Sequence, residues 1–208
     1  MTLGLIELLA ESRQRGFLGP GPVEDHLDHA RAFAVAVGSA PERALDLGAG
    51  GGLPGLVLAA ECWPATTWVF LDAQRKRTDF LREAVVALGL DERVTVITDR
   101  AEVVARSTEH RGRYDLVVSR SFGPPAVVLE CAAPLLGVGG RLVVSEPPAT
   151  SVAERWPTDD VATLGASAAS PVVVDGDDGF HFAVLRQEAP SPERFPRRVG
   201  IPTKRPLF

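Results

Sequence analysis

The stretch that most constrains this chain is residues 44–55, ALDLGAGGGLPG. Ala44, Leu45 and Leu47 indicate the end of a buried strand, and the glycines Gly48, Gly50, Gly51, Gly52 and Gly55 follow. Glycine reaches positive φ at little cost and lets a ligand approach the backbone closely. The run 53–60 then predicts a helix with Pro54 in its first turn. A strand, a glycine turn and a helix N-terminus together predict a nucleotide cradle in an α/β sheet.

The glycine spacing fits two nucleotide patterns. The dinucleotide pattern G-x-G-x-x-G is met by Gly50, Gly52 and Gly55, and it leaves Gly48 and Asp46 unexplained. The pattern acidic-x-G-x-G-x-G of S-adenosylmethionine (SAM) methyltransferases begins directly after the strand and accounts for both. We therefore predict that SAM is bound by Asp46, Gly48, Gly50 and Gly52. The alternative is a strand–turn–helix corner without a ligand. So many glycines would weaken such a corner unless a ligand has to approach the backbone.

The composition fits a single globular domain with extensions. Of the 208 residues, 45% are hydrophobic and 24% are charged, as in ordinary soluble proteins. The net charge of −5 argues against a protein that coats nucleic acid by bulk charge, but it allows a local basic patch. Cys62 and Cys131 form no CxxC pair and suggest buried thiols in a reducing compartment.

No membrane, secretion or metal-binding feature is expected. No run approaches the 18 or so apolar residues of a membrane span, and the N-terminus MTLGLIELLAESRQRG lacks a basic leader. His26 and His29 lie three residues apart without a carboxylate or cysteine cluster, so we predict solvated or capping histidines and no metal. These features predict a cytoplasmic protein without a membrane partner.

Strands and helices alternate along the rest of the chain. Helices are expected at 3–14, 23–38, about 80–88 and 125–136. Further strands are expected at 66–71, 94–99, 114–118 and 141–145. A hairpin follows, with strands at 172–174 and 180–185 joined by DGDDG. This order predicts a Rossmann-like class I methyltransferase fold, with a mostly parallel seven-stranded sheet, a C-terminal antiparallel hairpin and N-terminal helices. The expected divisions are an N-terminal helical extension at 1–40, the SAM-binding domain at 41–190 and a basic tail at 191–208. Residues 149–170 carry no clear pattern.

Two further segments carry functional predictions. Asp72 ends the second expected strand, where a carboxylate accepts hydrogen bonds from ribose hydroxyls; a carboxylate at a helix N-terminus is the alternative, and both can hold. The tail RFPRRVGIPTKRPLF has five cations and no acidic side chain. It predicts either an arm that contacts RNA phosphates or a segment folded back on the domain, pinned by Phe195, Ile201, Leu207 and Phe208. The candidate RNA-binding residues are Arg197, Arg198, Lys204 and Arg205.

Five motifs together resemble the GidB/RsmG family of bacterial small-subunit rRNA guanine-N7 methyltransferases. They are LDLGAGGGLPG, LDAQRKRTDFLRE at 71–83, DRAE at 99–102, VVSRSF at 117–122 and FPRRVGIPTKRPL at 195–207. The resemblance implies that the substrate is a base in a ribosomal particle. It also implies that the residues contacting or bordering SAM are Gly48, Leu53, Ala101, Glu102 and Arg120. One departure is Ser145-Glu146-Pro147, where the family tends to have Leu-Lys-Gly; it places an anion on the face where RNA should lie.

The chemistry implied needs no general base, because guanine N7 carries a lone pair and no proton. Positioning donor and acceptor in line is sufficient, and the predicted polar contributors are Arg120 and Arg100. Arg120 also suits a plainer role, holding the methionine carboxylate or a neighbouring acid. Two alternatives remain: a SAM methyltransferase for a small molecule or a protein, and a nucleotide-binding oxidoreductase or non-catalytic cofactor-binding module.

Overall fold

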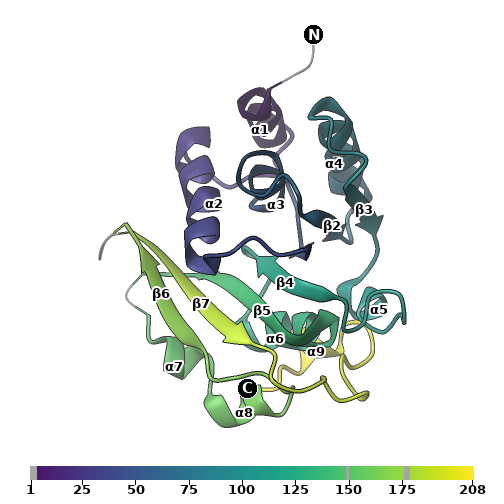
Figure 1. The fold of residues 1–208 in the computed structure, drawn as a ribbon, viewed down its shortest axis with the longest axis vertical. Coiled ribbons are helices and arrows are strands. Elements are labelled where there is room, and N and C mark those ends of the chain that lie inside the picture. Colours follow the sequence, from purple (N-terminus) through teal and green to yellow (C-terminus); the bar gives the residue numbers. More distant parts are fainter. Residues whose placement is uncertain (1–3, 149, 176–178) are drawn as a thin grey trace.

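The computed structural model describes residues 4–148, 150–175 and 179–208. Within them, seven strands form one sheet in the order β3-β2-β1-β4-β5-β7-β6 (Figure 1). The strands β1 to β5 pair in parallel, and β7 runs antiparallel to β5 and β6. Their bounds are β1 (Arg43–Leu47), β2 (Thr67–Asp72), β3 (Val94–Thr98), β4 (Tyr114–Ser119), β5 (Leu136–Glu146), β6 (Ser170–Val174) and β7 (Phe180–Arg186).

Helices cover both faces of the sheet (Figure 1). One face carries α1 (Leu5–Gln14), α2 (Val23–Val37), α3 (Gly55–Val57) with the π-helical turn η1 (Leu58–Cys62), and α4 (Arg75–Ala87). The other carries α5 (Ala101–Val104), α6 (Pro125–Ala132) with the 3₁₀ turn η2 (Ala133–Leu135), α7 (Val152–Arg155), α8 (Thr158–Ala162) and α9 (Ile201–Lys204). A parallel sheet must be covered on both faces, and β1 and β4 accordingly bury apolar side chains on both, Leu45 and Val117 on one face and Ala44 and Leu116 on the other.

The site follows from the strand order. The chain leaves β1 toward β2 on one side and returns to β4 on the other, so a crevice opens at the carboxyl ends of β1 and β4. The register places Leu47 beside Leu71 and Asp46 beside Val118, so the loops after these strands meet at one edge of the sheet. Within the described ranges, no helix is both long enough and apolar enough to cross a membrane.

The predicted fold class is confirmed, with local differences in its elements. The helix predicted over 53–60 is a short α3 followed by η1, and β5 begins at Leu136 rather than Arg141. The stretch without a clear pattern contains two short helices, α7 and α8. Leu3 of the first predicted helix and residues 176–178 of the predicted hairpin turn lie outside the described residues. The divisions at residues 40 and 190 stay predictions.

Candidate active site

The glycine loop after β1 is held open by backbone hydrogen bonds. The amides of Gly48 and Ala49 both donate to the carbonyl of Leu71 on β2, at 2.9 and 3.0 Å. Gly48 has a φ of 76°, and a Cβ there would lie 2.5 Å from Cδ2 of Phe122. Gly50 and Gly52 also have positive φ values of 52° and 102°. The loop therefore requires glycine both for its backbone shape and for the close approach of Phe122.

Asp46 lies under this loop, and it is not among the lining residues of the three hollows that are described below. Its side chain is fully buried, and Oδ2 accepts a hydrogen bond from the amide of Gly55 at 2.8 Å. Oδ1 has no partner among the described residues. Burial raises the pKa of Asp46 to about 7, against the Gly55 bond and Arg120, which lower it; Asp72 raises it further. The structure thus gives Asp46 the role of fixing the loop and the start of α3.

Asp72, at the end of β2, joins the loop to the next helix. Oδ2 accepts from the amide of Gly50 at 3.0 Å, and Oδ1 accepts from the amide of Gln74 at 2.8 Å, just before α4. Arg77 approaches Oδ2 at 3.6 Å. Both predicted roles are compatible with this placement, since each carboxylate oxygen keeps a second lone pair for a ribose hydroxyl.

A hollow of about 280 Å³ extends from the loop toward the end of β3. It is lined by Gly48, Asp72, Arg77, Asp99, Arg100, Ala101, Glu102, Ser121, Phe122 and Thr203, among others. Glu102 is buried, and its Oε1 accepts from the amide of Gly200 at 2.9 Å and from Arg100 at 3.2 Å. Burial acts to raise the pKa of Glu102, but these hydrogen bonds outweigh it and the pKa lies below its usual range.

Arg120 lies on the other side of the loop. It lines a second hollow, of about 170 Å³, with Leu53, Gly50 and Arg77. Its Nη2 lies 2.8 Å from Nδ1 of His26, and Nη1 is buried without a partner in the described part of the chain. Burial lowers the pKa of Arg120, while Asp46 raises it. A buried donor without a partner marks a place where an acceptor would be bound strongly.

The two predicted catalytic arginines are not brought together. Arg120 follows β4, whereas Arg100 follows β3, and the sheet order places two strands between them. Neighbouring strands are about 4.8 Å apart, so the two arginines serve different parts of the crevice. Arg100 lies on the side of Glu102, and only Arg120 lies at the junction of β1 and β4.

Ser121 is the residue where the hollows meet. It lines both hollows above and a third, of about 280 Å³, at the ends of β4 and β5. Ser121 has a φ of 56°, which is unusual for a residue other than glycine and is concentrated at functional sites. Phe122 lies next to it and separates the first hollow from the third, which it also lines.

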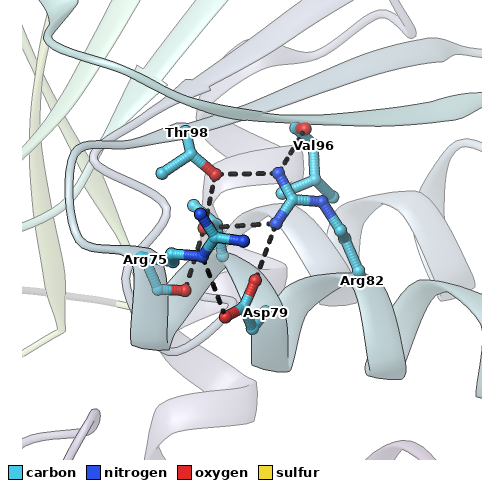
Figure 2. Close-up of polar contacts among 6 residues, drawn as sticks. Arg75, Asp79, Arg82, Val96 and Thr98 are labelled. Carbon is cyan, nitrogen blue, oxygen red and sulfur yellow. Dashed lines mark hydrogen bonds and ion pairs between the residues drawn. The ribbon is translucent and has the colours of Figure 1, made fainter.

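The helix α4 is fastened to the sheet edge beside the site (Figure 2). Arg82 donates to Oγ1 of Thr98 at 2.8 Å, to the carbonyl of Val96 at 3.2 Å and to Asp79 at 3.0 Å. Asp79 also faces Arg75 at 3.7 Å. Arg82 therefore fixes α4 against β3 and keeps Arg77, in the first turn of that helix, close to Asp72 at the end of β2.

The C-terminal tail is folded onto the domain. Arg197 donates from Nε and Nη2 to the two oxygens of Glu130, at 2.8 and 2.6 Å, and Glu130 is fully buried on α6. Phe195 is buried in the core, with Leu207 and Phe208 packed against it. Of the four predicted RNA-binding residues, Arg197 is thus engaged within the protein, whereas Arg198, Lys204 and Arg205 are exposed. Thr203 of this tail also lines the first hollow.

The prediction that the two histidines of α2 are solvated is wrong for His26, and His29 is half-buried. His26 is buried, and its Nε2 lies 3.2 Å from the carbonyl of Gly19 while Nδ1 faces Arg120. Because Arg120 can only donate, Nδ1 is the acceptor and the proton is on Nε2. His29 stacks on Phe180 at 4.9 Å and lines the third hollow. Burial lowers the pKa of His29 to about 4, helped by Arg120 and His26. The sequence showed only the three-residue spacing of the two histidines, because their partners Arg120 and Phe180 lie on distant segments.

The chain matches the model of rRNA small subunit methyltransferase G (GidB) over residues 23–149. It belongs to the GidB family. Ribosomal RNA small subunit methyltransferase G of Chloroflexus aggregans is 35% identical over 81% of this chain and 71% of the relative. The protein of the same name from Roseiflexus castenholzii is 36% identical over 84% of this chain and 75% of the relative. The resemblance predicted from the five motifs is therefore confirmed.

Solved structures show how widely the fold of this GidB family member is shared. A putative O-methyltransferase from Klebsiella pneumoniae has a TM-score of 0.61 and 16% identity, covering 88% of each chain. TrmN from Thermus thermophilus has a TM-score of 0.60 and 22% identity, covering 86% of this chain and 52% of TrmN. At these identities the likeness shows the fold alone, and it is the methyltransferase fold predicted above.

Proposed function

We propose that this chain transfers the methyl group of SAM to N7 of a guanine in small-subunit rRNA. The observation that carries the proposal is the meeting of three hollows at Ser121, on the carboxyl ends of β1 to β5. Two of them flank the glycine loop, and the third lies beyond Phe122 at the ends of β4 and β5. This arrangement offers separate room for a methyl donor and an acceptor on the two sides of one residue, and membership of the GidB family supports the choice of rRNA.

The residues around the loop fit SAM. Gly48 borders both hollows beside the loop, and the unpartnered Nη1 of Arg120 suits the methionine carboxylate. Asp72 is the proposed partner of the ribose hydroxyls, and Arg100, Ala101 and Glu102 border the proposed adenine position. SAM supplies an electrophilic methyl group when bound. No group of three or more potential ligands that could hold a metal occurs in the described part of the chain.

The chain's own contribution to the reaction is positioning. Guanine N7 attacks through a lone pair in the ring plane and loses no proton, so no side chain has to act as a base. His26 holds Arg120, and Arg120 in turn borders the loop. Ser121 and Phe122 separate the donor hollows from the acceptor hollow. Their role is to fix the angle at which donor and acceptor meet.

Transfer of radiolabelled methyl groups to isolated small ribosomal subunits tests the proposal. We expect transfer to the subunits, none to free small molecules, binding of SAM and no useful binding of NAD. At saturating SAM, the rate should stay flat between about pH 6 and 9; a steep limb set by one group would indicate a protonated acceptor. Activity only on small molecules or proteins would contradict the rRNA substrate while leaving SAM-dependent transfer intact.

Arg120→Ala is the sharpest variant for this test. It should reduce methyl transfer far more than it lowers the melting temperature, because Arg120 borders the loop with one unpartnered nitrogen. Arg113→Ala is the matched control, since Arg113 is an exposed arginine at the amino end of β4. Equal activity of the two variants would contradict the proposed role of Arg120.

A further inference from the structure

Glu146, at the end of β5, is not the exposed anion that sequence comparison suggested. Its side chain is only 1% exposed. Oε1 accepts a hydrogen bond from Nε1 of Trp156 at 2.8 Å, and Oε2 accepts one from Nε of Arg155. The carboxylate is therefore almost fully buried, and its charge is balanced by Arg155.

The charged side chain that is accessible to solvent beside Glu146 is Arg155. Its side chain is 35% exposed, and only Nε is used by Glu146. Neither terminal nitrogen, Nη1 nor Nη2, has a partner among the described residues. Because Nε is tied to a buried carboxylate, the planar guanidinium is held in place with its two terminal donors still available. Such a preorganised fork matches a phosphate group.

Arg155 borders the third hollow, at the ends of β4 and β5. The walls of this hollow include the flat or apolar side chains of Phe122, Pro125 and Trp156, and the neutral ring of His29. Its polar lining includes Ser145, Arg155 and the paired carboxylate of Glu146. Pockets that receive a base extruded from RNA or DNA combine such stacking surfaces with a few polar groups. The hollow has room for one base and adjoins Ser121, where the donor side begins.

We propose that this hollow receives the acceptor nucleotide and that Arg155, positioned by Glu146, binds a phosphate of that nucleotide. The inference rests on the proposed function and adds the binding residue for its substrate. A phosphate is favoured over the base edge for an electrostatic reason. Methyl transfer moves the positive charge from the sulfonium to the purine, and an arginine bonded to the purine would oppose that change. A phosphate contact positions the nucleotide without this penalty.

The test measures binding of small ribosomal subunits by the SAM-loaded protein across a salt series. Arg155→Ala should weaken binding about tenfold and reduce the salt slope by roughly 0.7 to 0.9, the loss of one phosphate contact. SAM affinity should not change. Because Arg155→Ala leaves Glu146 buried without its ion partner, the double variant Glu146→Gln/Arg155→Ala is measured in parallel. It should show the same loss of subunit binding with a melting temperature near that of the wild type.

Two further variants separate charge from positioning. Glu146→Gln keeps the cation but replaces its charged anchor with a neutral amide that has one acceptor oxygen, so KM for the subunit should rise while the salt slope stays close to that of the wild type. Arg113→Ala, far from the hollow, should match the wild type in every measurement. Wild-type-like binding by Arg155→Ala in an active enzyme would overturn this inference alone. So would a loss confined to the single variant and restored in the double one, which would mark a purely structural role. A wild type unable to methylate the subunit would overturn the proposed function, and the inference with it.

Discussion

The glycine loop and the C-terminal tail border the same hollow, through Gly48 and Thr203, but they are held in place by different forces. The loop is fixed by short-range backbone geometry: positive φ values and amide bonds to the neighbouring strand. The tail is fixed by side chains from distant segments, above all the ion pair of Arg197 with Glu130. The shape of the loop is thus encoded locally, whereas that of the tail depends on partners elsewhere in the chain.

The largest expected effect is in the loop. Gly48→Ala would place Cβ 2.5 Å from the ring of Phe122 at a φ of 76°, so either Phe122 or the loop must move. We expect SAM binding to fall by more than about 100-fold, since both hollows at the loop include Gly48. Calorimetric titration measures the effect. Gly89→Ala is the control, because its φ of 65° carries similar strain with no neighbour near the added Cβ; equal SAM affinity in both variants would contradict the steric argument.

Substitutions in the tail should change the stability of the fold more than they change methyl transfer. Arg197→Ala leaves the fully buried Glu130 without its ion partner, and we expect the free energy of unfolding to fall by about 3 kcal/mol. Arg198→Ala, the neighbouring exposed arginine, should change it by less than about 0.5 kcal/mol. Chemical denaturation measures both. Equal and small changes would mean that the ion pair does not hold the tail.

This contrast explains what could be predicted from the sequence. The glycine spacing and the strand pattern predicted the cradle, the sheet and the family, because each depends on neighbouring residues. The tail cations are evident in the sequence, but the partner of Arg197 lies on α6, so its ion pair could not be predicted. The same is true of His26 and Arg120, and of Arg155 and Glu146: each pair is formed by the tertiary structure.

The effect of replacing Asp72 should be no larger than either of these. Asp72→Ala removes the acceptor for the amide of Gly50 and the proposed partner of the ribose, so SAM binding should weaken by about 1–3 kcal/mol. Asp72→Asn, which keeps one acceptor oxygen, should lose less. Unchanged SAM affinity in Asp72→Ala would leave Asp72 only its structural role, in which the carboxylate accepts a hydrogen bond from the amide of Gln74.

Asp46 offers a pH test of the loop. Its pKa of about 7 means that the carboxyl is largely protonated below neutral pH, and the cationic sulfonium of SAM favours the ionised form. SAM affinity should therefore rise with pH up to about 7, by less than tenfold per unit, and level off above it, and binding below pH 7 should release part of a proton. Asp46→Asn should remove this dependence. The wild type and Asp46→Asn showing the same pH profile would assign the titration to another group.

The smallest effect concerns the cations that the tail leaves exposed. Arg198, Lys204 and Arg205 lie on a segment whose fold is held by other residues, so replacing all three with Ala should leave the melting temperature and SAM affinity close to those of the wild type. If they contact phosphates, three lost contacts should flatten the salt slope of subunit binding by roughly 2 to 2.7. Arg75→Ala, which removes an exposed cation of α4, is the control for a general change in charge. An unaltered slope in the triple variant would leave the tail as a structural element bordering the cofactor hollow. A flattened slope at constant stability would show that one segment both closes the hollow and binds RNA, with Arg197 serving the first task and its neighbours the second.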